Sequence, residues 1–262
     1  MTTAQRPLAL VTGASSGIGR EIADRLAREG HDLLIAAEDA DGLALTTRRV
    51  GARGGSVTEV VGDLRSAASV ADLADAAEAA GRPLDVLVLD AGVGAGGAFV
   101  EQELEDILSV VDLDVRSTVH LARLLLPGMV ARGRGRVLVL SSIAATMPGP
   151  YQAVYNASKS FVQSWTEALQ SELAGTGVTL TSLMPGPVDT DFFDRAGLLG
   201  SLMGKGPKDD PADVARQGVE ALLAGRRTVY AASPLVRVFG AVNAVLPDPV
   251  KAALHKQLAR PR

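Results

Sequence analysis

Short apolar segments alternate with longer segments of helical periodicity along the whole chain. The short segments are apolar throughout, which is typical of strands buried on both faces of a parallel sheet. The longer segments carry apolar residues three and four positions apart, as amphipathic helices do. The expected strands are residues 8–12, 33–37, 57–61, 86–89, 137–141, 178–184 and 228–231, and the expected helices are residues 18–29, 43–49, 67–79, 101–132, 153–174 and 212–224.

This alternation predicts an α/β fold with one doubly wound parallel sheet of about seven strands and helices on both faces. No repeat or low-complexity linker divides the chain, so residues 1–262 are expected to form a single domain. Residues 191–211 are expected to form a loop with a short helix, and residues 235–262 a C-terminal packing segment. Ligands of such folds bind beyond the carboxyl ends of the strands, near the switch in strand order.

Composition and charge exclude several classes of protein. The 262 residues include no Cys, which excludes thiolate metal sites and a cysteine nucleophile, and His31, His120 and His255 lack the spacing of metal ligands. No metal site is expected. The 26 Lys and Arg against 30 Asp and Glu disfavour a nucleic-acid partner. The longest apolar runs have the length of strands and no signal peptide is recognisable, so we expect a cytoplasmic protein without membrane spans.

Glycine is more frequent than usual, with 28 residues where ordinary usage of about 7% would give roughly 18. One glycine-rich turn follows the first expected strand and leads directly into a helix. There, glycines allow the backbone to approach a pyrophosphate, which would meet the free N–H groups of the helix start. A glycine turn without a ligand, or the turn of an S-adenosylmethionine-dependent transferase, would have a similar sequence pattern. The candidate cofactor-binding residues of this turn are Gly13, Ser15, Ser16, Gly17, Ile18 and Gly19.

A carboxylate stands where the ribose of an adenine dinucleotide is expected. Glu38 follows Gly19 by 38 − 19 = 19 residues, at the end of the second strand. A carboxylate there accepts hydrogen bonds from ribose hydroxyls and repels a 2′-phosphate. No Arg or Lys stands at this strand end, so NAD(H) is favoured as cofactor, while NADP(H) is not excluded. The neighbouring Asp39 is interpreted as a solvated surface carboxylate.

A tyrosine and a lysine occupy one face of an expected helix. Tyr155 and Lys159 are four residues apart, and Ser142 precedes Tyr155 by 155 − 142 = 13 residues at the end of the fifth strand. Tyrosine has an ordinary pKa of about 10 and acts as an acid or base near neutrality only if a cation stabilises its phenolate. Lys159 is placed to supply that cation. Ser142 is near enough in sequence for a loop to bring it to the same substrate oxygen.

With its glycine turn, Tyr-x-x-x-Lys pair and preceding serine, the chain resembles the short-chain dehydrogenase/reductase superfamily over almost its whole length. The resemblance implies a Rossmann-type fold, Tyr155 as general acid/base, Lys159 lowering the Tyr155 pKa and holding the nicotinamide ribose, and Ser142 bonding the substrate oxygen. It also implies a homodimer or homotetramer formed through residues 101–132 and 153–174. The further cofactor-binding residues that it implies are Asp63, Leu64, Asp90, Ala91, Gly92, Tyr155, Lys159, Pro185, Gly186, Val188 and Thr190.

Two positions depart from the family pattern. Asp90 and Asp114 stand where the family usually has asparagine, and the asparagine at the second position anchors a water that relays protons to the lysine. An ionised carboxylate only accepts hydrogen bonds and adds negative charge. We therefore expect Asp114 to take part in catalysis by ordering that water, but to raise the pKa of Lys159 and weaken its effect on Tyr155. Asp90 is expected to alter hydrogen bonding beside the cofactor more than the chemistry.

The resemblance also implies an apolar substrate pocket. A hydrophobic carbonyl compound or secondary alcohol is the expected small-molecule substrate of an NAD(P)-dependent oxidoreductase of this type. The alternative function is a catalytically weak dinucleotide-binding sensor or interaction protein. In that case Asp90 and Asp114 would reflect divergence from the catalytic members of the family. The leucines of the 191–211 loop would serve equally well to pack it onto the body. The candidate substrate residues are Ser142, Met147, Gln152, Phe192 and Phe193.

Overall fold

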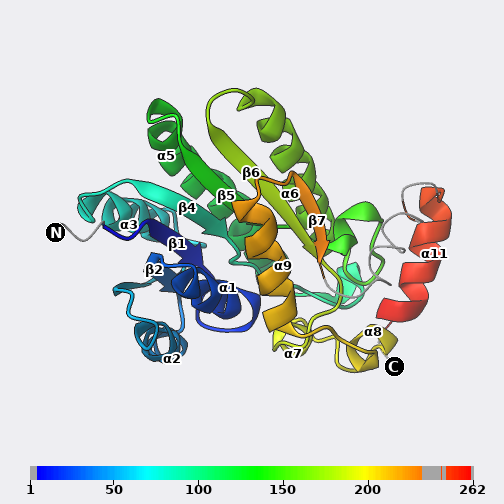
Figure 1. The fold of residues 1–262 in the computed structure, drawn as a ribbon. Coiled ribbons are helices and arrows are strands. Elements are labelled where there is room, and N and C mark those ends of the chain that lie inside the picture. The colour runs from blue at the N-terminus through cyan, green and yellow to red at the C-terminus, as the bar shows by residue number, and fades with distance from the viewer. Residues whose placement is uncertain (1–4, 232–242, 244–245, 261–262) are drawn as a thin grey trace.

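The fold is built on one parallel sheet of seven strands. The computed structural model describes residues 5–231, 243 and 246–260. Its strands lie side by side in the order β3-β2-β1-β4-β5-β6-β7 (Figure 1). This arrangement confirms the predicted doubly wound sheet, and the reversal of strand order lies between β1 and β4. The strands are β1 (Leu8–Thr12), β2 (Asp32–Ala37), β3 (Val57–Val61), β4 (Leu84–Leu89), β5 (Gly135–Leu140), β6 (Val178–Pro185) and β7 (Thr228–Ala231).

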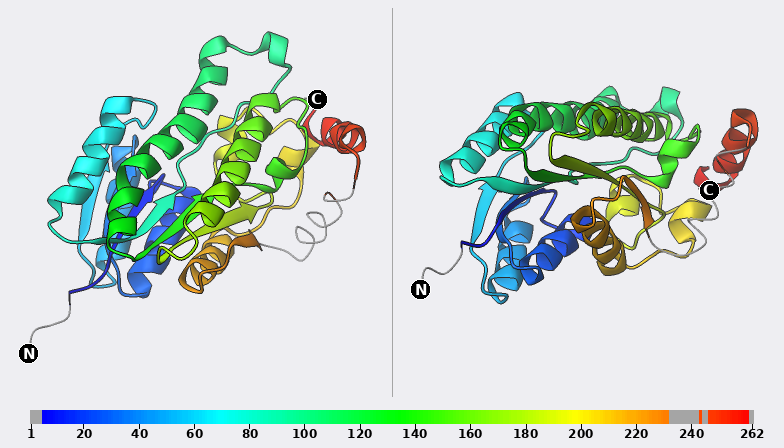
Figure 2. Two further views of the ribbon diagram at one scale, coloured as in Figure 1. Left: turned by 90° about the horizontal axis from the view of Figure 1, so that it is seen from above. Right: turned by 45° about the horizontal axis from the view of Figure 1, so that its top comes forward.

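Two layers of helices cover the sheet. Helices α1 (Gly17–Arg28), α2 (Ala40–Gly51) and α9 (Pro211–Leu223) cover one face, and α3 (Ala67–Ala79), α5 (Thr118–Ala131) and α6 (Ala153–Glu172) cover the other (Figure 2). Successive side chains of a strand point to opposite faces, so Leu10 packs in the second layer's core and Val11 in the first. The shorter helices are α4 (Leu104–Val110), α7 (Phe192–Arg195), α8 (Leu202–Lys205) and α11 (Asp248–Ala259).

The single helix expected over residues 101–132 is wrong in detail. A 3-10 turn (Phe99–Glu101) precedes α4, and a π-helical segment (Val111–Ser117) separates α4 from α5. The wider π turn brings Asp114 to the interior, where the residue is 1% exposed. An apolar periodicity of three and four residues continues through such a turn, so the break left no mark in the pattern.

The strand ends at the switch point are held together by Thr12. Its hydroxyl donates to the Val88 carbonyl at 3.2 Å and accepts from the amides of Asp90 and Ala91 at 3.0 and 3.1 Å. These bonds fix the chain after β4 against the turn after β1. Among the described residues, none of the helices combines the length and apolar character needed to cross a bilayer.

A buried carboxylate joins α1 to α2 behind the glycine turn. The Asp24 side chain is 4% exposed and lies 3.0 Å from Arg28 and 3.2 Å from Arg49 and Arg53. Burial alone would raise the pKa of Asp24, but hydrogen bonds from Arg53 and Arg28 and the charge of Arg49 hold it below its ordinary value. The cluster therefore stabilises the packing of the two helices that flank the turn.

Replacing Asp24 with Asn is expected to lower the free energy of unfolding by about 1–3 kcal/mol at neutral pH, because three guanidinium groups lose their shared partner. Since the folded-state pKa is depressed, this contribution is present above the unfolded-state pKa and is lost as the pH falls through the folded value. Urea unfolding should show a constant deficit at neutral pH that shrinks below about pH 4. Asp72→Asn, at an exposed position of α3, is the matched control; an equal loss there would contradict the account.

Candidate active site

A cavity of about 840 Å³ opens at the carboxyl ends of the central strands, beside the switch point. Nearly all of the residues predicted from the sequence line it. Two do not: Gly19 and Asp114 lie behind its wall, against Asp90 and Lys159 respectively. The predicted residues that line the cavity are Gly13, Ser15, Ser16, Gly17, Ile18, Glu38, Asp63, Leu64, Asp90, Ala91, Gly92, Ser142, Met147, Gln152, Tyr155, Lys159, Pro185, Gly186, Val188, Thr190, Phe192 and Phe193.

The turn after β1 has the geometry of an anion-binding site. Gly13 has φ +69°, and a Cβ on Gly19 would lie 2.4 Å from the Gly13 carbonyl oxygen, so neither position accepts a side chain without distortion. Helix α1 begins at Gly17, and the side chain of Ser16 caps none of its first N–H groups within the described part of the chain. Gly17 and Ile18 at this helix start line the cavity, whereas the Gly19 amide bonds the Asp90 carboxylate. A phosphate group in the cavity would meet the N–H groups of Gly17 and Ile18 and the positive end of the helix dipole.

Three polar side chains come together at the other end of the cavity. Ser142 begins a 3-10 helix (Ile143–Thr146), and its hydroxyl accepts from the Ala144 amide at 3.1 Å. Tyr155 and Lys159 lie one turn apart on α6, with the Lys159 Nζ 5.7 Å from the centre of the Tyr155 ring. The Lys159 ammonium also donates to the Leu140 carbonyl at 3.3 Å. The hydrogen bond to the end of β5 therefore holds the Lys159 ammonium beside the Tyr155 ring.

Asp114 forms a buried ion pair with Lys159. The carboxylate Oδ2 lies 3.4 Å from the Lys159 Nζ, and the two side chains are 0% and 5% exposed. The Val93 amide donates to Oδ1 at 2.8 Å, and the Ser158 hydroxyl donates to Oδ2 at 3.1 Å. Gly92 leaves room for the pair, since a Cβ there would lie 3.1 Å from the carboxylate and 3.2 Å from the ammonium.

These contacts shift the ionisation of the lysine and the tyrosine. Burial alone would lower the pKa of Lys159, but the Asp114 carboxylate and the Tyr155 phenol raise it above its ordinary value. Burial raises the pKa of Tyr155; Lys159 and hydrogen bonding from Ser142 oppose this rise, and the charge of Asp114 adds to it. The acidic group thus acts on the tyrosine in the opposite sense to the lysine.

Asp90 is a second buried acid at the cavity wall. It is 8% exposed, and its Oδ1 finds no hydrogen-bond partner among the described residues. Its Oδ2 fills the space beside Gly13 and Gly19, where added Cβ atoms would lie 2.9 and 2.5 Å away. Burial raises the pKa of Asp90 to about 7, although the charge of Lys159 opposes the rise.

A basic residue that the sequence interpretation missed lies at the end of β2. The Arg65 guanidinium reaches Glu38 at 2.8 Å and Asp63 at 3.0 Å. The expectation that no basic side chain stands at this strand end is wrong, because Arg65 arrives from the loop after β3. The available signal was its place directly after Asp63 and Leu64, which were themselves predicted to contact the cofactor.

The loop over residues 191–211 forms one wall of the far end of the cavity. The Phe192 ring lies 5.0 Å from the Tyr155 ring, and the Phe193 ring packs at 87° to Phe192. Leu198 is buried in a small cluster with Phe193, whereas Leu202 lines the cavity. Packing and cavity lining are therefore divided among the apolar residues of this loop.

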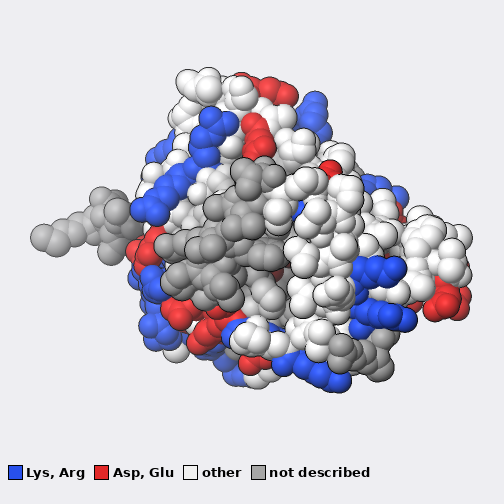
Figure 3. All heavy atoms as spheres, turned by 90° about the vertical axis from the view of Figure 1, so that its right-hand side faces the viewer, with Lys and Arg blue, Asp and Glu red and all other residues white. Residues whose placement is uncertain are grey.

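The C-terminal segment contributes more than the expected packing. Much of it, residues 232–242, 244–245 and 261–262, lies outside the described residues. Of the described part, Asn243 and four residues of α11 line the same cavity. On the side of the molecule where α11 lies, much of the visible surface is uncharged, with Lys and Arg side chains at its margins (Figure 3). The α11 residues are Lys251, Leu254, His255 and Leu258.

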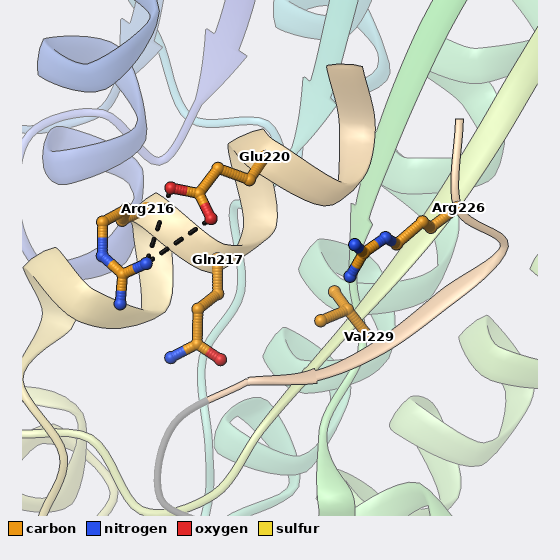
Figure 4. Close-up of a pocket in the computed structure, with 5 residues that line it drawn as sticks. All are labelled: Arg216, Gln217, Glu220, Arg226 and Val229. Carbon is orange, nitrogen blue, oxygen red and sulfur yellow. Dashed lines mark hydrogen bonds and ion pairs between the residues drawn. The ribbon is translucent and has the colours of Figure 1, made fainter. Parts of the chain in front are cut away.

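A smaller hollow of about 240 Å³ lies on the outer surface between α9 and β7 (Figure 4). Arg216 and Glu220 form an ion pair at its edge, 3.4 Å apart, and the hollow shares no lining residue with the large cavity. Within the described residues, no group of three His, Asp or Glu side chains is arranged to hold a metal ion. The polar side chains suited to catalysis thus lie together in the large cavity at the switch point.

Comparison with known proteins identifies the family. The family model for short chain dehydrogenases matches residues 7–197. The ketoacyl reductase HetN of Nostoc sp. is 36% identical over 188 residues, which are 72% of this chain and 66% of HetN.

Two solved structures have similar folds. A short-chain dehydrogenase from Sphingobium yanoikuyae in complex with NADPH has a TM-score of 0.82 at 26% identity, covering 91% of this chain and 92% of the other. A short-chain dehydrogenase/reductase from Burkholderia phymatum in complex with NAD has a TM-score of 0.81 at 29% identity, covering 91% and 93%. The chain belongs to the short-chain dehydrogenase/reductase family of oxidoreductases.

Proposed function

We propose that this protein is an NAD(P)-dependent oxidoreductase that interconverts a carbonyl group and a secondary alcohol on a hydrophobic small molecule. The observation that carries the proposal is the convergence of Ser142, Tyr155 and Lys159 at one end of a cavity whose other end is an anion-binding turn. Family membership and the similarity to a ketoacyl reductase support the same reaction class.

The cavity suits an adenine dinucleotide along its length. The glycine turn and the first N–H groups of α1 would bind the pyrophosphate, Glu38 the ribose, and Asp63 with Leu64 the adenine. The segment from Pro185 to Thr190 and the chain from Asp90 to Gly92 would hold the nicotinamide end. When bound, this group supplies or accepts the hydride of the reaction.

The proton is assigned to Tyr155. In reduction, the phenol donates a proton to the carbonyl oxygen, and in oxidation the phenolate takes it back from the hydroxyl. Ser142 hydrogen-bonds the same oxygen and stabilises the charge that develops there. Lys159 stabilises the phenolate through its positive charge and would hold the nicotinamide ribose of a bound dinucleotide. Asp114 acts through Lys159 as a positioning residue, and its charge keeps the tyrosine less acidic.

Cofactor preference depends on the Glu38 and Arg65 pair. We assign NAD(H) as the favoured cofactor because Glu38 lines the adenosine end and repels a 2′-phosphate. Arg65 is engaged by Glu38 and Asp63, so its positive charge is neutralised in place. Loss of the Glu38 charge would leave Arg65 paired with Asp63 alone, so that its guanidinium could also bind the additional phosphate of NADP(H).

Assembly into a homodimer or homotetramer is supported by apolar side chains on the outer helices. Leu104 and Leu108 on α4, Leu124 on α5 and Phe161 on α6 are between 41% and 61% exposed. Trp165 is partly buried against the core under α6. We propose that a second copy of the chain covers these side chains, since exposed apolar surface favours association.

The alternative function is a dinucleotide-binding sensor with little turnover. The two buried acids favour it, because they place negative charge beside the nicotinamide end and the pyrophosphate turn. The complete set of Ser142, Tyr155 and Lys159 favours the enzyme, since a sensor needs no proton donor beside its cofactor. Following nicotinamide absorbance across a panel of hydrophobic ketones and secondary alcohols, with both cofactors, separates the two: binding without turnover would support the sensor.

Replacing Tyr155 with Phe is expected to lower kcat about 10²- to 10⁴-fold, because the proton donor is lost while the ring remains. The dissociation constant for the dinucleotide should change by no more than about threefold, since the phenol contributes little binding. Tyr230→Phe, on β7 away from the cavity lining, is the matched control and should retain the parent rate. A Tyr155→Phe enzyme with near-parent turnover would overturn the assignment.

Replacing Glu38 with Gln is expected to raise the ratio of kcat/KM for NADP(H) over NAD(H) about tenfold, since it removes the repelling charge and releases Arg65. The measurement is steady-state kinetics with each cofactor and one shared substrate. Asp39→Asn removes a neighbouring charge but retains an oxygen to cap α2, and should leave the ratio unchanged. An unchanged ratio in Glu38→Gln would show that this carboxylate does not set the preference.

A further inference from the structure

One face of α11 forms a wall of the far end of the cavity. Lys251, Leu254, His255 and Leu258 all line it, and their spacing of three and four residues places them on a single helical face. Leu254 and Leu258 are 45% and 40% exposed, whereas His255 is 3% exposed. Helix α11 lies beyond the β7 edge of the sheet, apart from the two helix layers (Figure 2). The face thus places an imidazole between apolar side chains.

The hydrogen bonding of His255 fixes which of its nitrogens carries the proton. Its Nδ1 lies 3.1 Å from the Pro150 carbonyl oxygen, which can only accept, so Nδ1 bears the hydrogen. Burial lowers the pKa of His255 below its ordinary value, although the Pro150 carbonyl opposes this, so the site favours the neutral ring. The Nε2 lone pair on the opposite side of the ring has no partner among the described residues.

Gln152 supplies a second polar group beside the same turn. It is 2% exposed, lines the cavity, and its side-chain amide forms no hydrogen bond within the described residues. Backbone hydrogen bonds hold the turn that carries Pro150 and Gln152. The backbone N–H of Gln152 donates to the Gly149 carbonyl at 2.9 Å, and the backbone N–H of Gly97 donates to the Tyr151 carbonyl at 2.9 Å. Tyr151 has φ +66°, a costly conformation for a non-glycine residue.

We propose that His255 and Gln152 form a second polar subsite that selects substrates carrying a hydroxyl or secondary amide group on their apolar body. The proposal rests on the proposed oxidoreductase function and names a feature of its substrate. The Nε2 lone pair of His255 can only accept a hydrogen bond, so the substrate group must donate one. The side-chain amide of Gln152 can then donate to the oxygen of the same substrate group. A hydroxyl and a secondary amide satisfy both partners, whereas an ether leaves Nε2 unsatisfied.

The test uses methyl ketones with a terminal hydroxyl, each paired with its O-methyl ether of the same chain length. The length series is needed because the span from the reacting carbonyl to the subsite is to be found by experiment. The parent should prefer the hydroxyl member by about five- to tenfold in kcat/KM at the best length, through a lower KM. The ether member measures any general damage to the enzyme.

Two variants distinguish a substrate-selecting role of His255 from a purely structural one. In His255→Asn the side-chain amide can still donate to the Pro150 carbonyl but provides no acceptor at the Nε2 position, so the hydroxyl preference should fall to about onefold. In His255→Gln the longer side chain places its amide near the Nε2 position, so at least half of the preference should remain. A purely structural histidine would give the reverse order, with Asn the milder change.

The outcome separates this subsite from the catalytic proposal. The same pairs are also measured by calorimetric binding to the Tyr155→Phe protein with bound dinucleotide, which needs no turnover. If ketones are reduced but His255→Asn keeps the full hydroxyl preference, the subsite proposal fails and the oxidoreductase stands. If no ketone is reduced while His255→Asn abolishes a binding preference, the subsite stands and the proposed reaction fails. Equal binding of both members to every protein would overturn the subsite.

Discussion

The arrangement of the site depends on one buried ion pair, between Asp114 and Lys159. Two charges this far from water are tolerated only when their hydrogen bonds are satisfied, because the desolvation cost otherwise exceeds their attraction. Val93 and Ser158 donate to the carboxylate, and the ammonium also reaches the Leu140 carbonyl. The π-helical turn brings Asp114 inward, and Gly92 leaves the space. The end of β5, helix α6 and the π-helical turn thus each contribute to holding the pair.

This constraint changes how the lysine can act. In the proposed mechanism the lysine makes the tyrosine more acidic, yet here Asp114 lies directly behind the ammonium and Asp90 is close enough to act on its pKa as well. Asp114 raises the pKa of Lys159, and its charge partly cancels the influence of the lysine on the phenol. In the proposed mechanism, the raised pKa of Tyr155 favours its protonated form, which is the form that donates to a carbonyl oxygen.

Most of the fold could be predicted from the sequence, because buried parallel strands and amphipathic helices leave different periodicities. Strand β1 and helix α3 have the predicted ends, and all of the predicted site residues except Gly19 and Asp114 line one cavity. The π turn was missed because a single extra residue in a helical turn hardly alters the pattern. Arg65 and His255 were missed for another reason: Arg65 reaches Glu38, and His255 reaches the cavity, from a segment distant in the sequence, and proximity of that kind depends on tertiary packing.

The most direct test of the account is the ionisation of Tyr155 itself, followed by NMR of tyrosine labelled at Cζ. The chain has only 3 Tyr, so Tyr155→Phe assigns the signal. We predict that Tyr155 titrates above the ordinary tyrosine pKa in the parent, and at lower pH in Asp114→Asn, because removing the carboxylate charge stabilises the phenolate. A Tyr155 signal that titrates at the same pH in both proteins, or higher in Asp114→Asn, would contradict the account.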